Sequence, residues 1–183
     1  MASAGEGKTT VVSNLAKPLA EGGLSVVVLS EDVRSVTSIE CEWPELEGRP
    51  GLSDYLNDTS IDVEDIVIGT GEPGISVVTR GDAPDSVVPL VDSERMVELM
   101  AVLRERADWI LIDAAAVLES ADTVRLAPMA DGTMLVVDGI HTTLSAAQSI
   151  TAMLADAGAT TIGFFHNRTR RNPIFQMLRQ EPV

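Results

Sequence analysis

Ala4-Gly5-Glu6-Gly7-Lys8-Thr9-Thr10 leads directly into a helical pattern over residues 11–19. Glycines allow successive backbone N–H groups to turn toward a bound anion, and the start of a helix adds partial positive charge. A lysine at this spacing reaches the β- and γ-phosphates of a nucleotide, and the next hydroxyl binds Mg²⁺. The stretch therefore predicts a phosphate-binding loop. Its predicted nucleotide-binding residues are Gly5, Glu6, Gly7, Lys8, Thr9 and Thr10.

The match to the full pattern G-x-x-x-x-G-K-[S/T] is incomplete, because Ala2 stands at the position of the first glycine. A chance G-x-G-K-T-T is nevertheless rare, on the order of 10⁻⁴ in a chain of this length at average residue usage. The alternative interpretation is a glycine-rich entry to a helix with no ligand. A phosphate-binding loop follows a central β-strand, and this sequence has too few residues ahead of the loop to form one. We therefore expect residues 1–183 to form one nucleotide-binding domain with a gap in its sheet: either a fragment lacking the strand before the loop, or a domain in which another segment replaces that strand.

Apolar runs and helical patterns alternate along the rest of the chain. Strands are predicted at residues 26–29, 75–78, 109–112, 134–137 and 162–165, and helices at 9–20, 93–106, 121–129 and 144–157. Shorter helical pieces are predicted at 52–56 and 63–68. This alternation is typical of βαβ units with a mostly parallel sheet. The expected fold is a single α/β domain, a doubly wound sheet of the P-loop NTPase type with the ligand at the carboxyl ends of the strands.

Charge and composition exclude several classes of protein. The formal net charge of −15 would repel a phosphate backbone, which argues against nucleic-acid binding. Cys41 is the only cysteine, so no internal disulfide or cysteine metal site is possible, and we expect an intracellular protein. No apolar run is long enough to cross a membrane, so direct membrane insertion is not expected.

A second candidate site residue ends the predicted strand at 109–112. Asp113 follows Ile110-Leu111-Ile112, where a buried strand delivers a carboxylate to the ligand edge of a parallel sheet. Alone, this pattern fits an ordinary strand end. Behind a phosphate-binding loop it predicts a Mg²⁺ position, which makes Lys8 and Asp113 the first candidates for catalytic residues.

With these motifs in place, the chain resembles the cytoplasmic ATP-binding domain of the bacterial tyrosine kinases of capsule and exopolysaccharide export, relatives of the ParA/MinD ATPases. Two stretches favour the kinase branch, Gly51-Leu52-Ser53-Asp54-Tyr55-Leu56 and Ser93-Glu94-Arg95-Met96. The signature lysine of ParA/MinD would fall at Ser3. The remaining matches are residues 5–10 and 14–16, residues 28–34, residues 110–113, residues 130–132 with 135–137, and Asn167-Arg168.

The resemblance also identifies departures from the family pattern. The strand at 26–29 ends in that family with an aspartate that helps to bind Mg²⁺ and activates the attacking hydroxyl; here the position is Ser30. Asp32 matches the second acid of the pattern and is the candidate to replace it, both as metal ligand and as catalytic carboxylate. Ala115-Ala116 stand where the family has two prolines. Tyr55 is the only tyrosine, whereas the family's kinases carry a tyrosine-rich tail.

The resemblance implies ATP or ADP with Mg²⁺ as cofactors, Thr9, Asp113 and Asp32 as metal ligands, and Asn167 at the adenine. It also implies a membrane-anchored polysaccharide export or co-polymerase protein as partner, the possibility of homo-oligomers, and a position at the inner face of the membrane through that partner or another segment. Three functions stay open: an ATP-dependent tyrosine kinase with weakened catalysis, a non-catalytic regulatory module of polysaccharide export, and a ParA/MinD-type ATPase.

Overall fold

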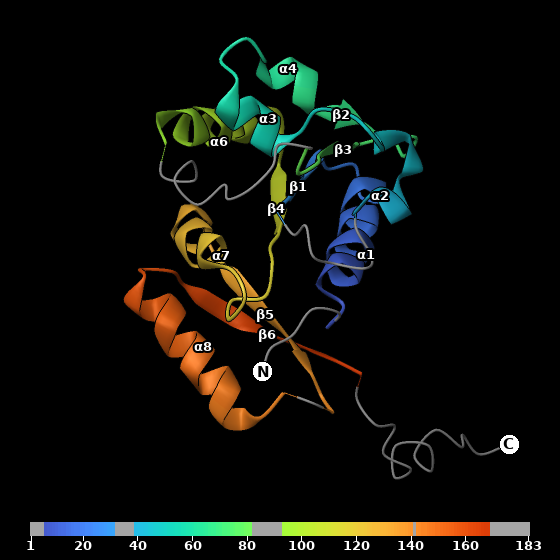
Figure 1. The fold of residues 1–183 in the computed structure, drawn as a ribbon. Helices are drawn as coiled ribbons and strands as arrows, with labels where there is room; N and C mark the ends of the chain where they lie inside the picture. Colours follow the sequence, from blue (N-terminus) through green and yellow to red (C-terminus); the bar gives the residue numbers. More distant parts are fainter. Residues whose placement is uncertain (1–5, 32–38, 82–92, 141, 169–183) are drawn as a thin grey trace, which may run out of the picture.

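The computed structural model describes residues 6–31, 39–81, 93–140 and 142–168. All five predicted strands and all four predicted long helices are present (Figure 1). In chain order the elements are α1 (Lys8–Glu21), β1 (Val26–Ser30), α2 (Ile39–Glu42), η1 (Pro44–Leu46), α3 (Leu52–Asn57), α4 (Val63–Ile66), β2 (Ile68–Gly69), β3 (Ile75–Val78), α6 (Glu94–Arg106), β4 (Trp109–Asp113), α7 (Ala121–Leu126), η2 (Ala127–Met129), β5 (Thr133–Asp138), α8 (Leu144–Asp156) and β6 (Thr161–Asn167).

The first sheet has the strand order β2-β3-β1-β4. β1 lies in its centre, pairs in parallel with both β3 and β4, and is buried along its whole length. β2 is antiparallel to β3. The helix predicted at 63–68 ends at Ile66 because Ile68 and Gly69 instead pair with β3, a contact that local sequence does not specify.

Helices cover both faces of this sheet, as the continuous apolar strands predict. Val27 and Leu29 of β1 pack into a core with α3, α4 and α6, whereas Val26 and Val28 pack on the opposite face with α1 and α2. Alternate side chains of one strand thus enter two separate cores. The α/β, mostly parallel fold class is confirmed.

The second sheet consists of β5 and β6, which are parallel, with α8 packed against them. In the described ranges no ladder joins β4 to β5, so the parallel arrangement is interrupted between them (Figure 1).

Local signals set the helix boundaries. The hydroxyl of Ser93 accepts a hydrogen bond from the Met96 N–H, and that of Thr143 accepts one from the Ala146 N–H, so each hydroxyl caps the start of its helix. Gly158 has a φ of 88° just after α8, a left-handed conformation that ends a helix at little cost with glycine.

The two stretches that favour the kinase branch lie against each other. Arg95 of α6 donates from Nε to the Tyr55 carbonyl at 2.9 Å and from Nη2 to the Ile61 carbonyl at 2.9 Å. Its guanidinium also stacks 4.0 Å from the centre of the Tyr55 ring. Arg95 therefore fixes α3 and the segment that follows it onto α6.

Candidate functional site

The two described residues before α1, Glu6 and Gly7, are compatible with an anion site. Gly7 is the N-cap of α1 with a φ of 90° and a ψ of 25°, a left-handed conformation that favours glycine. Lys8 is the first helical residue, and the first turn of α1 contains no acidic residue. The N–H groups of a first helical turn have no intrahelical acceptor, so this end of α1 is electrostatically suited to a phosphate.

The loop is attached to the second sheet by two side-chain hydrogen bonds. Asn167, at the end of β6, donates from Nδ2 to the Glu6 carbonyl at 2.9 Å. Thr142 donates from its hydroxyl to Glu6 Oε1 at 2.9 Å, and the Glu6 side chain is 3% exposed. The carboxylate of Glu6 thus contacts Thr142, and Asn167 contacts the loop backbone.

Asp113 lies where the sequence predicts it, at the carboxyl end of β4 and 1% exposed. Its register partner on β1 is Ser30, which is 3% exposed. Glu6, Lys8, Asp113 and Thr142 all line one cavity of about 870 Å³. The structure therefore brings the loop lysine and the strand carboxylate to the same cavity, while Ser30 supplies a hydroxyl beside Asp113 where the family pattern has a carboxylate.

Thr9 lies in the first turn of α1 and is 4% exposed. Its backbone carbonyl accepts a hydrogen bond from the Ser13 hydroxyl at 2.8 Å. Thr10 is exposed on the same turn. Gly5 and Asp32 lie outside the described residues.

Glu31 is a functional candidate that sequence reasoning missed. Its carboxylate is 4% exposed and accepts a hydrogen bond from the Ala115 N–H at 3.0 Å. The hydroxyls of Ser120 and Thr123 also donate to it, each at 3.4 Å. Glu31 thereby holds the loop that follows Asp113. A proline at position 115 would have no N–H to donate to Glu31. The alanines make this loop less rigid than prolines would, and the hydrogen bond from Ala115 to Glu31 holds it in place instead.

The residues present fit a nucleotide with Mg²⁺. The described part of the chain holds no cluster of three or more His, Cys, Asp or Glu side chains positioned for a metal. A Mg²⁺ ion in a nucleotide site does not need such a cluster, because one or two protein oxygens bind it together with the phosphates of the nucleotide. The Thr9 hydroxyl and the Asp113 carboxylate are donors of that type. None of the described helices is long and apolar enough to cross a membrane.

No protein-family model matches the chain. The chain is 30% identical over 163 residues to the tyrosine-protein kinase YwqD of Bacillus subtilis. This match covers 89% of the chain and 68% of YwqD. The chain is also 31% identical over 163 residues to the putative tyrosine-protein kinase EpsB of Ralstonia solanacearum. That match covers 89% of this chain but 21% of EpsB, so the chain spans about a fifth of the length of the first curated relatives.

Solved structures give the same assignment of the fold. The VpsO kinase domain superposes with a TM-score of 0.83 at 30% identity, over 92% of this chain and 82% of that one. The septum site-determining protein MinD of Pyrococcus horikoshii, solved with Mg-ADP, has a TM-score of 0.71 at 22% identity, over 98% of this chain and 74% of that one. The second likeness supports the fold alone.

Proposed function

The chain belongs to the bacterial tyrosine-protein kinase family, and from this premise we propose that it binds ATP or ADP with Mg²⁺ at the loop before α1. The observation that carries the proposal is the shared cavity, in which Lys8, at the start of α1, and Asp113, at the end of β4, line the same space. A helix N-terminus, a lysine and a strand-end carboxylate are the groups that a metal-bound polyphosphate requires.

Each residue has a proposed role. Gly5 and Gly7 allow the backbone to surround the phosphates, Lys8 contacts the β- and γ-phosphates, and Thr10 lies on the α-phosphate side. Thr9 and Asp113 bind the metal or its water, and Asp32 is the further acid proposed for it. Asn167 is proposed at the adenine, although its amide also supports the loop through Glu6. Bound Mg²⁺ would neutralise phosphate charge.

The catalytic step is proposed to be weak. Ser30 is buried beside Asp113, and a serine hydroxyl is neither a strong Mg²⁺ ligand nor a general base at neutral pH. The same observation supports the second candidate function, a non-catalytic module whose nucleotide state organises polysaccharide export. In both cases the proposed partner is a membrane-anchored export or co-polymerase protein, with homo-oligomers possible.

Calorimetric titration with ATP and with ADP, with and without Mg²⁺, tests the binding proposal. Lys8→Met should weaken binding at least tenfold. Lys17→Met is the matched control, because Lys17 is the other lysine of the chain and pairs on the surface with Glu42 and Glu72. Binding that is equal in Lys8→Met and the parent chain would overturn the proposed site.

Turnover of ATP separates the two candidate functions. Ser30→Asp restores a carboxylate opposite Asp113 and should raise Mg²⁺-dependent turnover at least tenfold if the site is otherwise competent. Ser145→Asp adds the same charge on the exposed start of α8 and should leave turnover unchanged. Turnover that stays at the Lys8→Met background in Ser30→Asp would favour the non-catalytic module.

A further inference from the structure

Glu6 places a carboxylate inside a loop that is otherwise suited to an anion. It directly precedes Gly7, the N-cap of α1, and is 3% exposed. Glu6 and Lys8 line the same cavity of about 870 Å³, where the phosphates are proposed to bind. A carboxylate repels a phosphate, and burial strengthens the repulsion because the protein interior screens charge less than water does. The loop therefore accepts a phosphate only when the Glu6 carboxylate is held away from it.

Thr142 holds this carboxylate from the second sheet. Its Oγ1 donates to Glu6 Oε1 at 2.9 Å, although the two residues are 136 positions apart in the sequence. Thr142 follows β5 and lines the same cavity as Glu6. A hydrogen bond to an ionised oxygen is stronger than one between neutral groups. The position of the Glu6 side chain is therefore set by a residue far along the chain.

The end of β5 fixes the direction in which Thr142 donates. Thr142 Oγ1 accepts a hydrogen bond from the Asp138 N–H at 3.1 Å, and the Thr142 N–H donates to the Asp138 carbonyl at 2.9 Å. Because the Asp138 N–H occupies the oxygen, the single hydrogen of the hydroxyl is directed to Glu6. Asp138 is also the register partner of Asn167, whose amide holds the Glu6 carbonyl. The side chain and the backbone of Glu6 are thus held from the ends of two adjacent strands.

We propose that Thr142 is a positioning residue of the nucleotide site, which keeps the Glu6 carboxylate turned away from the phosphates. This role rests on the proposed function, because the ligand is the nucleotide assigned to Lys8 and Asp113. With the hydrogen bond made, the acid of the loop faces Thr142, and the positive start of α1 is left to the anion. Without it, the buried carboxylate has lost this donor, and its charge opposes a ligand of the same sign. The effect of Thr142 therefore depends on the charge of Glu6.

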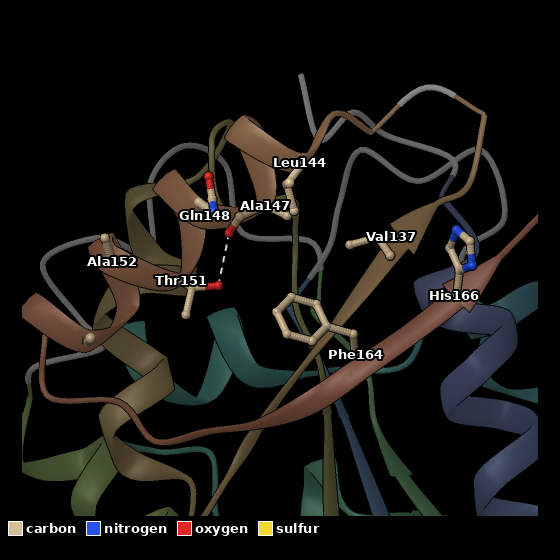
Figure 2. Close-up of a pocket in the computed structure, with 9 residues that line it drawn as sticks. Val137, Leu144, Ala147, Gln148, Thr151, Ala152, Phe164 and His166 are labelled. Carbon is tan, nitrogen blue, oxygen red and sulfur yellow. Dashed lines mark hydrogen bonds between the residues drawn. The ribbon is translucent and has the colours of Figure 1, made fainter.

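Calorimetric titration of the full chain with ATP and Mg²⁺ measures this effect. Thr142→Val keeps the shape of the side chain without its hydroxyl and should weaken binding at least about fivefold, the loss expected for one hydrogen bond to a charged group. Thr142→Ser keeps the hydroxyl and should bind ATP more tightly than Thr142→Val. Thr151→Val is the matched control, because the Thr151 hydroxyl donates to the Ala147 carbonyl at 2.9 Å within α8 (Figure 2). Its loss should leave ATP affinity unchanged.

Neutralising Glu6 separates the charge effect from a purely structural one. In a Glu6→Gln background, Thr142→Val should weaken ATP binding by no more than about twofold, because an amide carries no charge to repel the phosphates. A threonine that only supported the fold would give the same loss in both backgrounds. Chemical denaturation of every variant distinguishes a loss of binding from a loss of folding. If Thr142→Val does not fold, Thr142→Ala takes its place in both backgrounds.

Equal losses of affinity in the parent and the Glu6→Gln backgrounds would overturn the proposal, as would unchanged ATP affinity in Thr142→Val. Failure of this role is distinguishable from failure of the proposed function. Binding by the parent chain that Lys8→Met removes, together with unaffected binding by Thr142→Val, would refute the role of Thr142 and leave the nucleotide site standing. A parent chain that binds no nucleotide would refute both.

Discussion

Asn167 Nδ2 lies 2.9 Å from the backbone carbonyl oxygen of Glu6, although the two residues are 161 positions apart in the sequence. This hydrogen bond links the end of β6 directly to the loop before α1. The same amide lies where a Cβ on Gly7 would stand. The candidate phosphate-binding loop is therefore shaped by the last strand of the second sheet as well as by its own glycines.

Gly7→Ala should abolish the loop conformation. Alanine at a φ of 90° costs about 1 kcal/mol or more, and its Cβ would overlap Asn167 Nδ2. We expect nucleotide affinity, measured by calorimetry, to fall at least tenfold. Adding Asn167→Ala removes the overlap but leaves the strained φ, so recovery should be partial. Full recovery in the double variant would show that backbone strain at Gly7 is unimportant.

Asn167→Ala alone should loosen the loop. It removes the hydrogen bond to the Glu6 carbonyl and the local one that Asn167 Oδ1 accepts from the exposed Arg168 N–H, and it should lower the free energy of unfolding by about 1–2 kcal/mol. Amide exchange of α1's first turn should accelerate. Asn57→Ala is a suitable control, because Asn57 makes a similar side-chain to backbone bond, with Ser53 at 2.8 Å, in the distant α3. An equal effect of both variants on the first turn of α1 would contradict the assignment.

Glu31→Ala should be destabilising, by about 1–3 kcal/mol in chemical denaturation, because the buried N–H of Ala115 loses its acceptor, whereas the Thr123 hydroxyl keeps the Ala115 carbonyl at 3.1 Å. Ala115→Pro removes the N–H from the same contact. The two changes should be less than additive in a double-mutant cycle. Glu21→Ala, at an exposed position, is the control. Strict additivity would mean that Glu31 does not act through Ala115.

Arg95→Lys should destabilise the protein although it keeps the charge. Lysine cannot donate to the Tyr55 and Ile61 carbonyls together while stacking on the ring, so we expect a loss of about 2 kcal/mol in the free energy of unfolding. Arg49→Lys, an exposed arginine, should change stability little. Similar unfolding midpoints for the two variants would contradict a role for the planar guanidinium.

Asp108 should make stability depend on pH. The backbone N–H and the hydroxyl of Ser25, at 2.8 and 2.7 Å, lower the pKa of this carboxyl below its ordinary value of 3.8. Because the pKa of Asp108 is lower in the folded than in the unfolded protein, the ionised carboxylate stabilises the fold. This stabilisation is complete well above the ordinary pKa and is lost as the pH falls through the folded-state pKa. Thermal unfolding should thus distinguish Asp108→Asn from the parent at pH 7 and progressively less below about pH 4. Asp156→Asn, an exposed control, should differ little at either pH.

The sequence predicted the elements whose signals are local. The apolar runs gave the strands β1, β3, β4, β5 and β6, because a strand buried on both faces must be apolar at consecutive positions. The helices predicted at 93–106 and 144–157 begin where the structure has them, at hydroxyl side chains that accept from the first helical N–H groups. The position of Asp113 followed from the strand that it ends.

Contacts between distant segments could not be predicted in this way. Nothing around Glu31 indicates that its carboxylate is buried against Ala115, 84 positions away, and nothing around Asn167 indicates the Glu6 carbonyl. The short β2 depends on β3 for its hydrogen bonds. The sequence by itself determined the strands β1, β3, β4, β5 and β6 and the positions of the long helices, and it predicted the phosphate-binding loop, because these features depend on neighbouring residues. Only the tertiary structure decided what holds the loop and where the sheet is interrupted, because those features depend on which segments meet in space.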